Sequence, residues 1–300
     1  MKANKNFAVF ILSHGRPDNV ITYDKLRKHG YTGKIYIIVD DEDNTINAYK
    51  EKYEDQVIIF SKAKYQNKFD IMDNFDGNKV IVYARNACYD IARRLKIDYF
   101  FEYEDDYTSF LYRYVKNFAL KSKPVRNLDA IFVAMINCLD ETKSNTIAFA
   151  QGGDFIGGAN SFNNNTYKRK AMNSFLFKVN QNPLDDTTFI GRMNDDVNTY
   201  LTQGKIGKLF FQITVINLVQ LATQSNSGGN TEAYKSFGTY VKSFYSVIAA
   251  PDCCRIDLMG DAHKRIHHRI NWNNAVPKII SEQHCKIKPL SLHTNKVQEV

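Results

Sequence analysis

Long hydrophobic runs are missing from this 300-residue sequence. The apolar run near its N-terminus covers only Phe7–Leu12, whereas a membrane-spanning helix needs about 20 apolar residues and a secretory signal about 7–15. We therefore expect no membrane span, no secretory signal and a cytoplasmic location. A run of this length instead fits a buried first strand.

Cysteine is scarce and unevenly spaced. The five cysteines are odd in number and follow no regular disulfide framework, which favours free thiols in a reducing compartment. A zinc site formed by Cys253 and Cys254 with nearby histidines is disfavoured, because adjacent cysteines lack the usual two-residue spacer.

Several common catalytic motifs are also missing. The sequence contains no GxxxxGK[ST], HExxH or GxSxG pattern, which argues against P-loop enzymes, zincin proteases and α/β-hydrolases. It shows no internal repeat, heptad pattern or linker. We therefore expect one continuous domain over residues 1–300, whose halves, 1–112 and 113–300, differ in role.

Acidic side chains are outnumbered by basic ones. The chain has 32 Asp and Glu against 40 Lys and Arg, for a net charge of +8. This balance favours a polyanionic partner such as nucleic acid, a nucleotide or an anionic membrane, although ordinary surface charge for solubility also produces it.

Strand and helix patterns alternate through the first 112 residues. Apolar runs predict strands near 7–12, 34–43, 56–60 and 98–106, separated by helical patterns near 20–30, 45–53 and 82–97. Residues 79–83 also resemble a strand that leads into the third helix. The alternation predicts an α/β fold of Rossmann-like type, with a mixed, largely parallel sheet flanked by helices.

Beyond residue 112 the pattern is weaker. It predicts a helix over 128–141, a strand over 173–180, a helix that follows a loop near 195, and a strand or hairpin from about 207.

Polar segments follow the predicted strands of the first half. In parallel sheets ligands bind beyond the carboxyl ends of the strands, so these segments are candidate binding loops. Arg85 lies near the start of a predicted helix, where an Arg and a helix N-terminus together suit phosphate oxygens. Together these features indicate a nucleotide-diphosphate pocket, and its candidate residues are Ser13, His14, Gly15, Arg16, Asp40, Asp41, Arg85, Glu104 and Asp105.

An acidic run, Glu104-Asp105-Asp106, ends the fourth predicted strand. Crowded carboxylates repel one another, and a divalent cation such as Mn²⁺ or Mg²⁺ would offset that repulsion while neutralising a diphosphate. A solvated acidic turn is the alternative.

Three stretches resemble a known family. Residues 84–106, ARNACYDIARRLKIDYFFEYEDD, resemble the stretch that ends in the DxD motif of GT-A fold glycosyltransferases, and residues 192–208, RMNDDVNTYLTQGKIGK, resemble their later block with the catalytic base. The opening FILSHGRPDN, residues 10–19, is similar to phage TET/JBP-associated glycosyltransferases that decorate hydroxymethylated DNA bases. The resemblance covers about residues 7–210. It implies a nucleotide-sugar half over 1–112 and an acceptor-binding half over 113–300.

The resemblance implies a role for each matching residue. Asp40 or Asp41 would contact the base or ribose of a UDP-sugar, and Arg85 would contact its diphosphate. Glu104 would face the sugar nucleotide, at a position where the family usually has Asp. The remaining carboxylates divide between metal and catalysis: Asp106 would bind the metal, Asp196 would be the general base, and Asp195 would raise its basicity.

Late histidines and basic residues complete the candidate list. The family often adds a late His to its metal, and His263 and His267, four residues apart, would share a helix face. The single Trp suits stacking on a sugar or base, or partly buried packing. The candidate metal ligands are Asp106, Glu104, His267 and His268. The candidate acceptor or DNA contacts are Trp272, Lys168, Arg169, Lys170 and Arg269, within basic segments 113–126, 168–170 and 264–269.

The function that the resemblance implies is metal-dependent, inverting transfer of a sugar from a nucleotide-diphosphate donor. The expected acceptor is a hydroxymethylated pyrimidine in phage DNA, in the cytoplasm of an infected bacterium. Three alternatives stay open: a glycosyltransferase acting on a surface glycan, a nucleotidyltransferase, and a non-catalytic DNA-binding protein.

Overall fold

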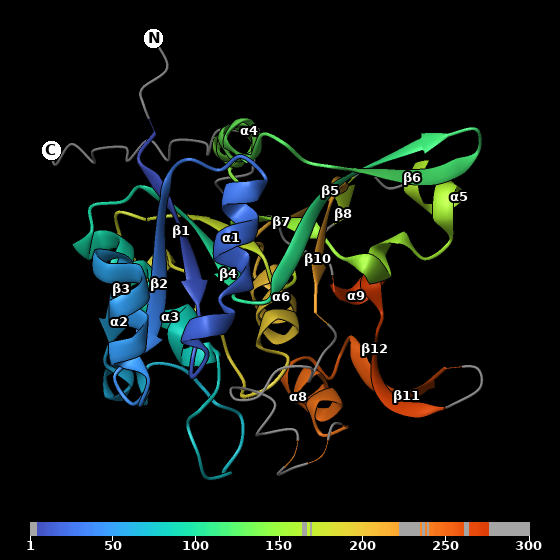
Figure 1. Ribbon diagram of the computed structural model, residues 1–300. Coiled ribbons are helices and arrows are strands. Elements are labelled where there is room, and N and C mark those ends of the chain that lie inside the picture. The colour runs from blue at the N-terminus through green and yellow to red at the C-terminus, as the bar shows by residue number, and fades with distance from the viewer. Residues whose placement is uncertain are drawn as a thin grey trace, which may run out of the picture.

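The architecture is an α/β fold around one large mixed sheet (Figure 1). The computed structural model describes residues 5–163, 167–168, 170–221, 235, 238, 240–260 and 264–275. Its strands are β1 (Phe7–Leu12), β2 (Lys34–Asp40), β3 (Val57–Phe60), β4 (Tyr99–Glu104), β5 (Tyr107–Lys116), β6 (Ala119–Pro124), β7 (Thr146–Ala150), β8 (Tyr167–Lys168), β9 (Phe175–Lys178), β10 (Phe210–Gln220), β11 (Cys254–Met259) and β12 (Arg265–Ile270). Its helices are α1 (Ile21–Lys28), α2 (Ile46–Tyr53), α3 (Val82–Arg94), α4 (Leu128–Thr142), α5 (Gly158–Asn163), α6 (Asp195–Lys205), α8 (Lys242–Ala249) and α9 (Trp272–Ala275).

The strand order of the main sheet is β3-β2-β1-β4-β9-β7-β10-β5-β6, with β8 paired to β10. The first four of these strands pair in parallel, as the alternating strand and helix pattern predicts. β9 runs antiparallel to both of its neighbours, β10 is parallel to β7, and β5 and β6 form an antiparallel arm at the end of the sheet. Because β1, β2 and β4 are parallel, their carboxyl ends lie at the same edge.

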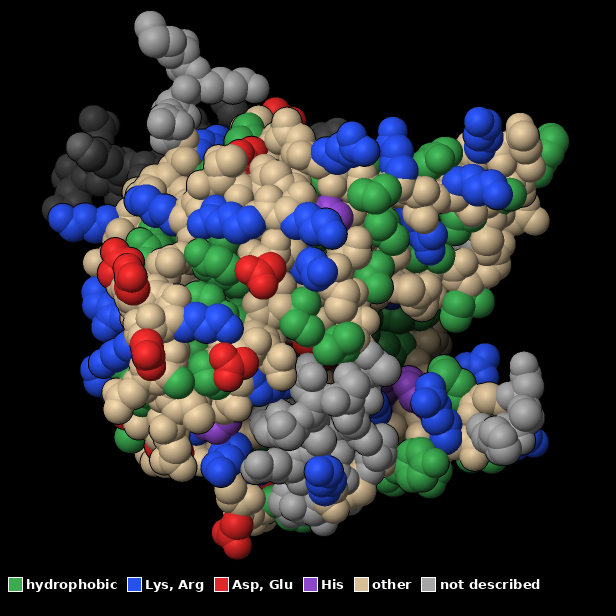
Figure 2. All heavy atoms as spheres, in the orientation of Figure 1, with side chains coloured by type: hydrophobic (Ala, Val, Ile, Leu, Met, Phe, Trp, Pro, Cys, Tyr) green, Lys and Arg blue, Asp and Glu red, His purple; other side chains and the backbone are tan. Residues whose placement is uncertain are grey.

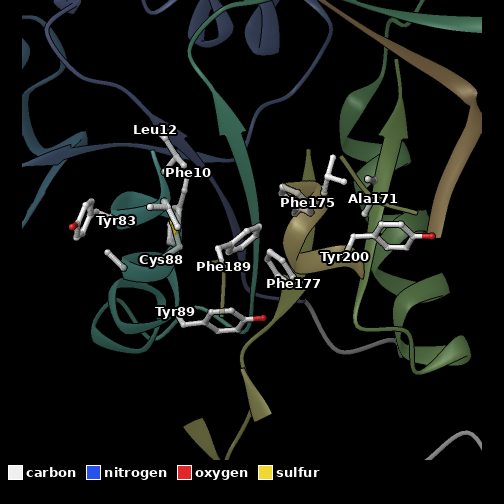
Figure 3. Close-up of a cluster of buried hydrophobic side chains, with 14 of the residues drawn as sticks. Phe10, Leu12, Tyr83, Cys88, Tyr89, Ala171, Phe175, Phe177, Phe189 and Tyr200 are labelled. Atoms are coloured by element: carbon white, nitrogen blue, oxygen red, sulfur yellow. The ribbon is translucent and has the colours of Figure 1, made fainter. Parts of the chain in front are cut away.

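Two apolar clusters cover the two faces of this sheet. One contains side chains from α3, α6 and α8, and the other contains side chains from α1, α2 and α4. Figure 3 shows part of the first cluster, where Phe175 and Phe177 of β9 lie near Phe189. The ring of Phe189 meets that of Phe175 edge-on, with centroids 5.1 Å apart. This packing fixes α3 and the loop before α6 against the same part of the sheet.

Most elements predicted in the first half are confirmed, and one is wrong. Residues 79–83 form no strand in the described chain, because α3 already begins at Val82. Arg85 is the fourth residue of α3 and lies in its first turn, as predicted.

The second half differs more from its prediction. The basic stretch near 113–126 forms the β5–β6 arm, and the buried strand β7 follows α4; neither strand pattern was recognised. His267 lies on strand β12, so the helix expected to join it to His263 is wrong. His263 itself lies outside the described residues. Within the described residues, no helix is long and apolar enough to cross a membrane.

Candidate active site

Three carboxylates from two elements, β4 and α6, meet around the guanidinium of Arg85. Arg85 lies on the buried side of α3 with 2% of its side chain exposed. Its Nη1 is 2.7 Å from Glu102 Oε1, and its Nη2 is 2.7 Å from Glu104 Oε1. Its Nε is 2.6 Å from Asp195 Oδ2 at the start of α6. The guanidinium thus joins the acidic end of β4 to the acid pair of α6.

This cluster has more negative than positive charge. Burial, opposed by Arg85, raises the pKa of Glu102 to about 7 and the pKa of Glu104 to about 8. Burial also raises the pKa of Asp195 to about 6, with Asp196 adding to the rise. A single guanidinium cannot balance these groups, so the site favours a further cation.

The placement of Arg85 changes the role expected of it. The resemblance implied contact with a diphosphate, but the guanidinium is enclosed and all three of its nitrogens face carboxylates. The rings of Phe175 and Phe189 lie 5.2 and 5.4 Å from it and restrict access further. In this structure Arg85 positions the acids around it.

The turn after β4 separates the acidic run into residues with different partners. Glu104 contacts Arg85, and Asp105 lies 3.1 Å from Arg16 Nη2 and accepts a hydrogen bond from Ser13 Oγ at 2.5 Å. Asp106 Oδ1, by contrast, is buried and has no hydrogen-bond partner among the described residues. Burial and the charge of Asp105 raise the pKa of Asp106 to about 6. Of the three described residues of this run, Asp106 is the one with a buried carboxylate oxygen that has no hydrogen-bond partner, so it can bind an ion.

Thr22 of α1 fixes the backbone of this turn. Its hydroxyl donates to the Glu104 carbonyl at 2.6 Å and accepts from the amide of Tyr107 at 2.9 Å, while its own amide donates to the Asp105 carbonyl at 3.1 Å. Sequence inspection did not single out Thr22, because its partners lie more than 80 residues away.

The loop after β1 lies beside the same sheet edge. The His14 ring lies 2.6 Å from Asp40 Oδ2, and the amide of Gly15 donates to Asp43 at 2.6 Å. Gly15 has φ +70°, and a Cβ at this position would meet no atom within 4 Å. Arg16 contacts Asp105 and retains a buried Nε without a hydrogen-bond partner in the described chain. The structure therefore gathers the predicted donor-binding loop close to the acidic run.

Asp40 and Asp41 have different surroundings. Asp40 is buried, with Lys62 Nζ 2.8 Å from its carboxylate, and its partners His14 and Lys62 outweigh its burial and lower its pKa to about 2. Asp41 is exposed and accepts a hydrogen bond from the Lys62 amide at 3.0 Å. Sequence inspection missed Lys62, and no local pattern indicates a buried lysine.

The acid pair of α6 is divided by its partners. Asp195 is buried against Arg85, whereas Asp196 is half-buried and its Oδ1 accepts from the amide of Val197 at 2.7 Å. Burial raises the pKa of Asp196, with Arg85 and Lys242 opposing. Of the two acids, Asp195 forms an ion pair with Arg85, and the carboxylate of Asp196 forms none with it.

The candidate histidine ligands have hydrogen-bond partners other than the acids. The His268 ring lies 3.3 Å from the Asn194 amide nitrogen, and burial lowers its pKa to about 4. His267 bonds to the His268 carbonyl at 2.7 Å. Across the described residues, no group of three or more His, Cys, Asp or Glu side chains is close enough together to hold a metal. The four expected metal ligands are therefore not assembled as one set.

The expected acceptor contacts are dispersed. Lys168 and Lys170 both pair with the buried carboxylate of Asp154, so their charges are already engaged. Trp272 is 46% exposed with its ring 5.8 Å from that of Tyr200, and Arg269 pairs with Asp257 at 3.0 Å. Arg169 lies outside the described residues.

A comparison with protein-family models decides the family. The model described as TET-Associated Glycosyltransferase matches residues 7–229, which include the loop after β1, the acidic run and the acid pair of α6. This chain belongs to that family. It is a glycosyltransferase, and the expected enzyme class is confirmed.

Solved structures resemble this glycosyltransferase remotely. A complex of glucosyl-3-phosphoglycerate synthase from Mycobacterium tuberculosis with Mn²⁺, UDP and phosphoglyceric acid is 8% identical, with a TM-score of 0.46 over 90% of this chain and 88% of that one. A complex of S. aureus TarS 1–349 with UDP is 9% identical, with a TM-score of 0.43 over 82% and 66%. A comparison with curated proteins gave no match. The family assignment rests on the family model alone.

Proposed function

We propose that this glycosyltransferase transfers a sugar from a UDP-linked donor to the hydroxymethyl group of a pyrimidine in DNA, with inversion at the anomeric carbon. The observation that carries the proposal is the contact of Arg85 with Glu104 and with Asp195. It brings the acidic run and the acid pair of α6, which are 89 or more residues apart in the chain, into one catalytic cluster.

Asp196 is the proposed general base. Asp195 is occupied by Arg85, so Asp196 is the member of the pair able to accept the proton of the acceptor hydroxyl. As that proton moves to Asp196, the hydroxyl oxygen bonds to the anomeric carbon, and the bond to the nucleoside diphosphate breaks on the opposite face. The raised pKa of Asp196 strengthens it as a base.

The acidic run fits a divalent cation. Mg²⁺ and Mn²⁺ prefer carboxylate oxygens, and Mg²⁺ is usually held by one or two carboxylates together with substrate phosphates. Asp106 would hold the ion, because its Oδ1 is buried and unpartnered, with Glu104 beside it. When bound, the ion would stabilise charge on the leaving diphosphate. A site completed by substrate phosphates does not require a third protein ligand.

Arg16 replaces Arg85 as the proposed diphosphate contact. Its side chain is 18% exposed, and its Nε lacks a hydrogen-bond partner within the described residues. We assign donor binding to residues 1–112 and acceptor binding to the remainder of a single domain. A DNA acceptor places the reaction in the cytoplasm of a phage-infected bacterium.

Mass spectrometry of DNA products tests the proposal. Duplex DNA with hydroxymethylated pyrimidines is incubated with Mn²⁺ and a panel of nucleotide sugars, and a hexose or pentose mass increase is expected with one UDP-sugar. Asp196→Asn should reduce transfer by about 10²–10⁴-fold, while donor affinity, measured by calorimetry, stays within about twofold.

The exposed carboxylate variant Glu51→Gln is the matched control and should transfer at the wild-type rate. Transfer to oligosaccharide but not to any hydroxymethylated DNA would show that the acceptor is a surface glycan. Unchanged turnover in Asp196→Asn would show that another group is the base.

A further inference from the structure

The arm formed by β5 and β6 projects from the main sheet and bears a strongly basic surface (Figure 1). Residues 111–126 contain five Lys or Arg and no Asp or Glu. Figure 2 shows Lys and Arg side chains over this part of the molecule. An unbalanced concentration of positive charge on one projecting element favours a polyanionic partner.

The two faces of the arm differ. Register and alternation place Arg113, Val115 and Leu120 on one face, and the guanidinium of Arg113 lies 4.4 Å from the centre of the Phe155 ring. Both strands of the arm also contact α5. The inner face is therefore supported by the protein.

The outer face combines aromatic rings with lysines. Tyr112 pairs with Lys123 and Tyr114 with Lys121, so these four side chains share the outer face with Lys116. Tyr112 is half-buried against the core at the base of the arm, whereas Tyr114 and the three lysines are exposed. Lys123 Nζ lies 5.5 Å from the centre of the Tyr112 ring and 6.0 Å from that of Tyr114. Lysines interleaved with aromatic rings combine phosphate attraction with apolar contact, as nucleic-acid-binding surfaces do.

The tip of the arm carries an unsupported aromatic side chain. Phe118 is 99% exposed, and both it and Asn117 have positive φ, at 58° and 51°. A fully exposed Phe costs solubility and contributes nothing to the core. Apolar side chains at the tips of DNA-binding elements contact or enter the base stack.

A second copy of the chain is a poorer occupant of this surface. β6 is the last strand of the sheet, where an open edge could pair with another chain. However, lysines and a proline on an edge strand oppose such pairing, and β6 carries Lys121, Lys123 and Pro124.

The arm is connected directly to the catalytic cluster. β5 begins at Tyr107, the residue after Asp106, and runs for 10 residues to Lys116. At about 3.4 Å per residue the tip lies up to roughly 30 Å from the acidic run, the length of about nine or ten base pairs of duplex DNA. A two-stranded ribbon also fits a DNA groove.

We propose that the β5–β6 arm binds duplex DNA about one helical turn from the acceptor base, with the Tyr and Lys face on the backbone and Phe118 in a groove. This proposal rests on the proposed function and adds to it a requirement for duplex length. The arm anchors DNA and takes no part in the chemistry.

Transfer to duplexes of two lengths tests the arm. A single hydroxymethylated base is flanked by about five or about fifteen base pairs, the shorter duplex ending before the arm and the longer one reaching it. The wild-type protein should show a KM at least fivefold lower for the long duplex, with equal kcat. Phe118→Ala and the double variant Lys121→Ala/Lys123→Ala should raise the KM for the long duplex to that for the short one. Neither should alter transfer to the short duplex.

The matched controls are Leu184→Ala, an apolar side chain 89% exposed elsewhere, and Lys50→Ala/Lys64→Ala, two exposed lysines of the donor half. Both should keep the wild-type length dependence. For the Lys121→Ala/Lys123→Ala variant and the long duplex, the logarithm of the binding constant is plotted against the logarithm of the salt concentration. The magnitude of its slope should fall by about two, because two phosphate contacts are lost.

The outcomes separate this proposal from the proposed function. If the wild-type protein modifies the short duplex and arm variants keep the preference for the long one, the arm proposal is overturned while the function stands. If no DNA is modified, the function fails, and fluorescence anisotropy with the same duplexes then decides whether the arm binds them. Loss of self-association in arm variants without loss of length dependence would identify a second copy as the occupant, against the proposal.

Discussion

At the scale of single residues, Arg85 organises the active site. One guanidinium contacts Glu102, Glu104 and Asp195 from a fully enclosed position. Removing one partner of a buried ion cluster leaves uncompensated charge in the interior, which costs more than the intact cluster contributes. Arg85 therefore governs both stability and the placement of the catalytic acids.

Replacing Arg85 tests this role. Arg85→Met should lower the free energy of unfolding by about 3–5 kcal/mol, because three carboxylates lose their shared partner. The free energy of unfolding of Arg85→Lys should lie between those of Arg85→Met and the wild type. Arg94→Met, on the exposed side of the same helix, should change the free energy of unfolding by no more than about 0.5 kcal/mol from the wild type. Urea unfolding measures all three, and a loss below about 1 kcal/mol for Arg85→Met would contradict the role.

Asp40 gives a pH-dependent prediction. Despite its burial, His14 and Lys62 lower its pKa from 3.8 to about 2. A folded-state pKa below the unfolded value means that Asp40 stabilises the fold above about pH 4, and that this contribution is lost as pH falls toward 2. The contribution is about 2 kcal/mol, since one pKa unit corresponds to about 1.4 kcal/mol.

Unfolding at pH 5 and pH 2.5 measures this effect. Between these values Asp40→Asn should lose less stability than the wild type, by about 1–2 kcal/mol. Asp55→Asn, at an exposed position, is the control. Equal losses in Asp40→Asn and the wild type would show that Asp40 has no stabilising ionic contact.

At the scale of elements, the loop before α6 holds the acid pair in place. The side chain of Asn86 accepts from the Phe189 amide and donates to its carbonyl, both at 2.9 Å. Gly191 has φ +86°, and a Cβ there would overlap the Asn198 amide nitrogen. The loop thus requires glycine both for its backbone conformation and for space.

Two glycine substitutions separate these requirements. Gly77 also has positive φ, at +93°, but faces open space. Gly77→Ala should therefore cost about 1 kcal/mol, from the backbone alone. Gly191→Ala should cost about 2–4 kcal/mol and reduce turnover, because the overlap adds to the strain and displaces α6. Thermal unfolding and transfer assays measure both, and equal costs would show that Asn198 gives way freely.

The elements themselves were predictable to different degrees. Apolar runs between helical patterns identified β1 to β4, because a parallel sheet buries both faces of its strands. The β5–β6 arm escaped prediction because β6 is largely exposed and carries two lysines, so no apolar alternation marks it. The strand predicted over residues 79–83 was wrong, because the apolar run Val80, Ile81 and Val82 leads into the first turn of α3.

At the scale of the whole molecule, the net charge of +8 is distributed by the fold. Lys168 and Lys170 are bound to Asp154, and Arg85 is enclosed by acids. The lysines on the outer face of the β5–β6 arm, by contrast, are exposed. Sequence counting treats these basic residues as equivalent, whereas the structure distinguishes the charges available to DNA from those used internally.

The sequence by itself determined the α/β class, the parallel strands of the first half and the order of the acidic run and the acid pair. Hydrophobic periodicity and composition can be read from neighbouring residues alone. Only the tertiary structure decided which acid is free. Asp106 differs from Asp105, and Asp196 from Asp195, through the partners Arg16, Ser13 and Arg85. Those partners come from distant parts of the chain, and burial makes each such contact strong enough to fix the role of a carboxylate.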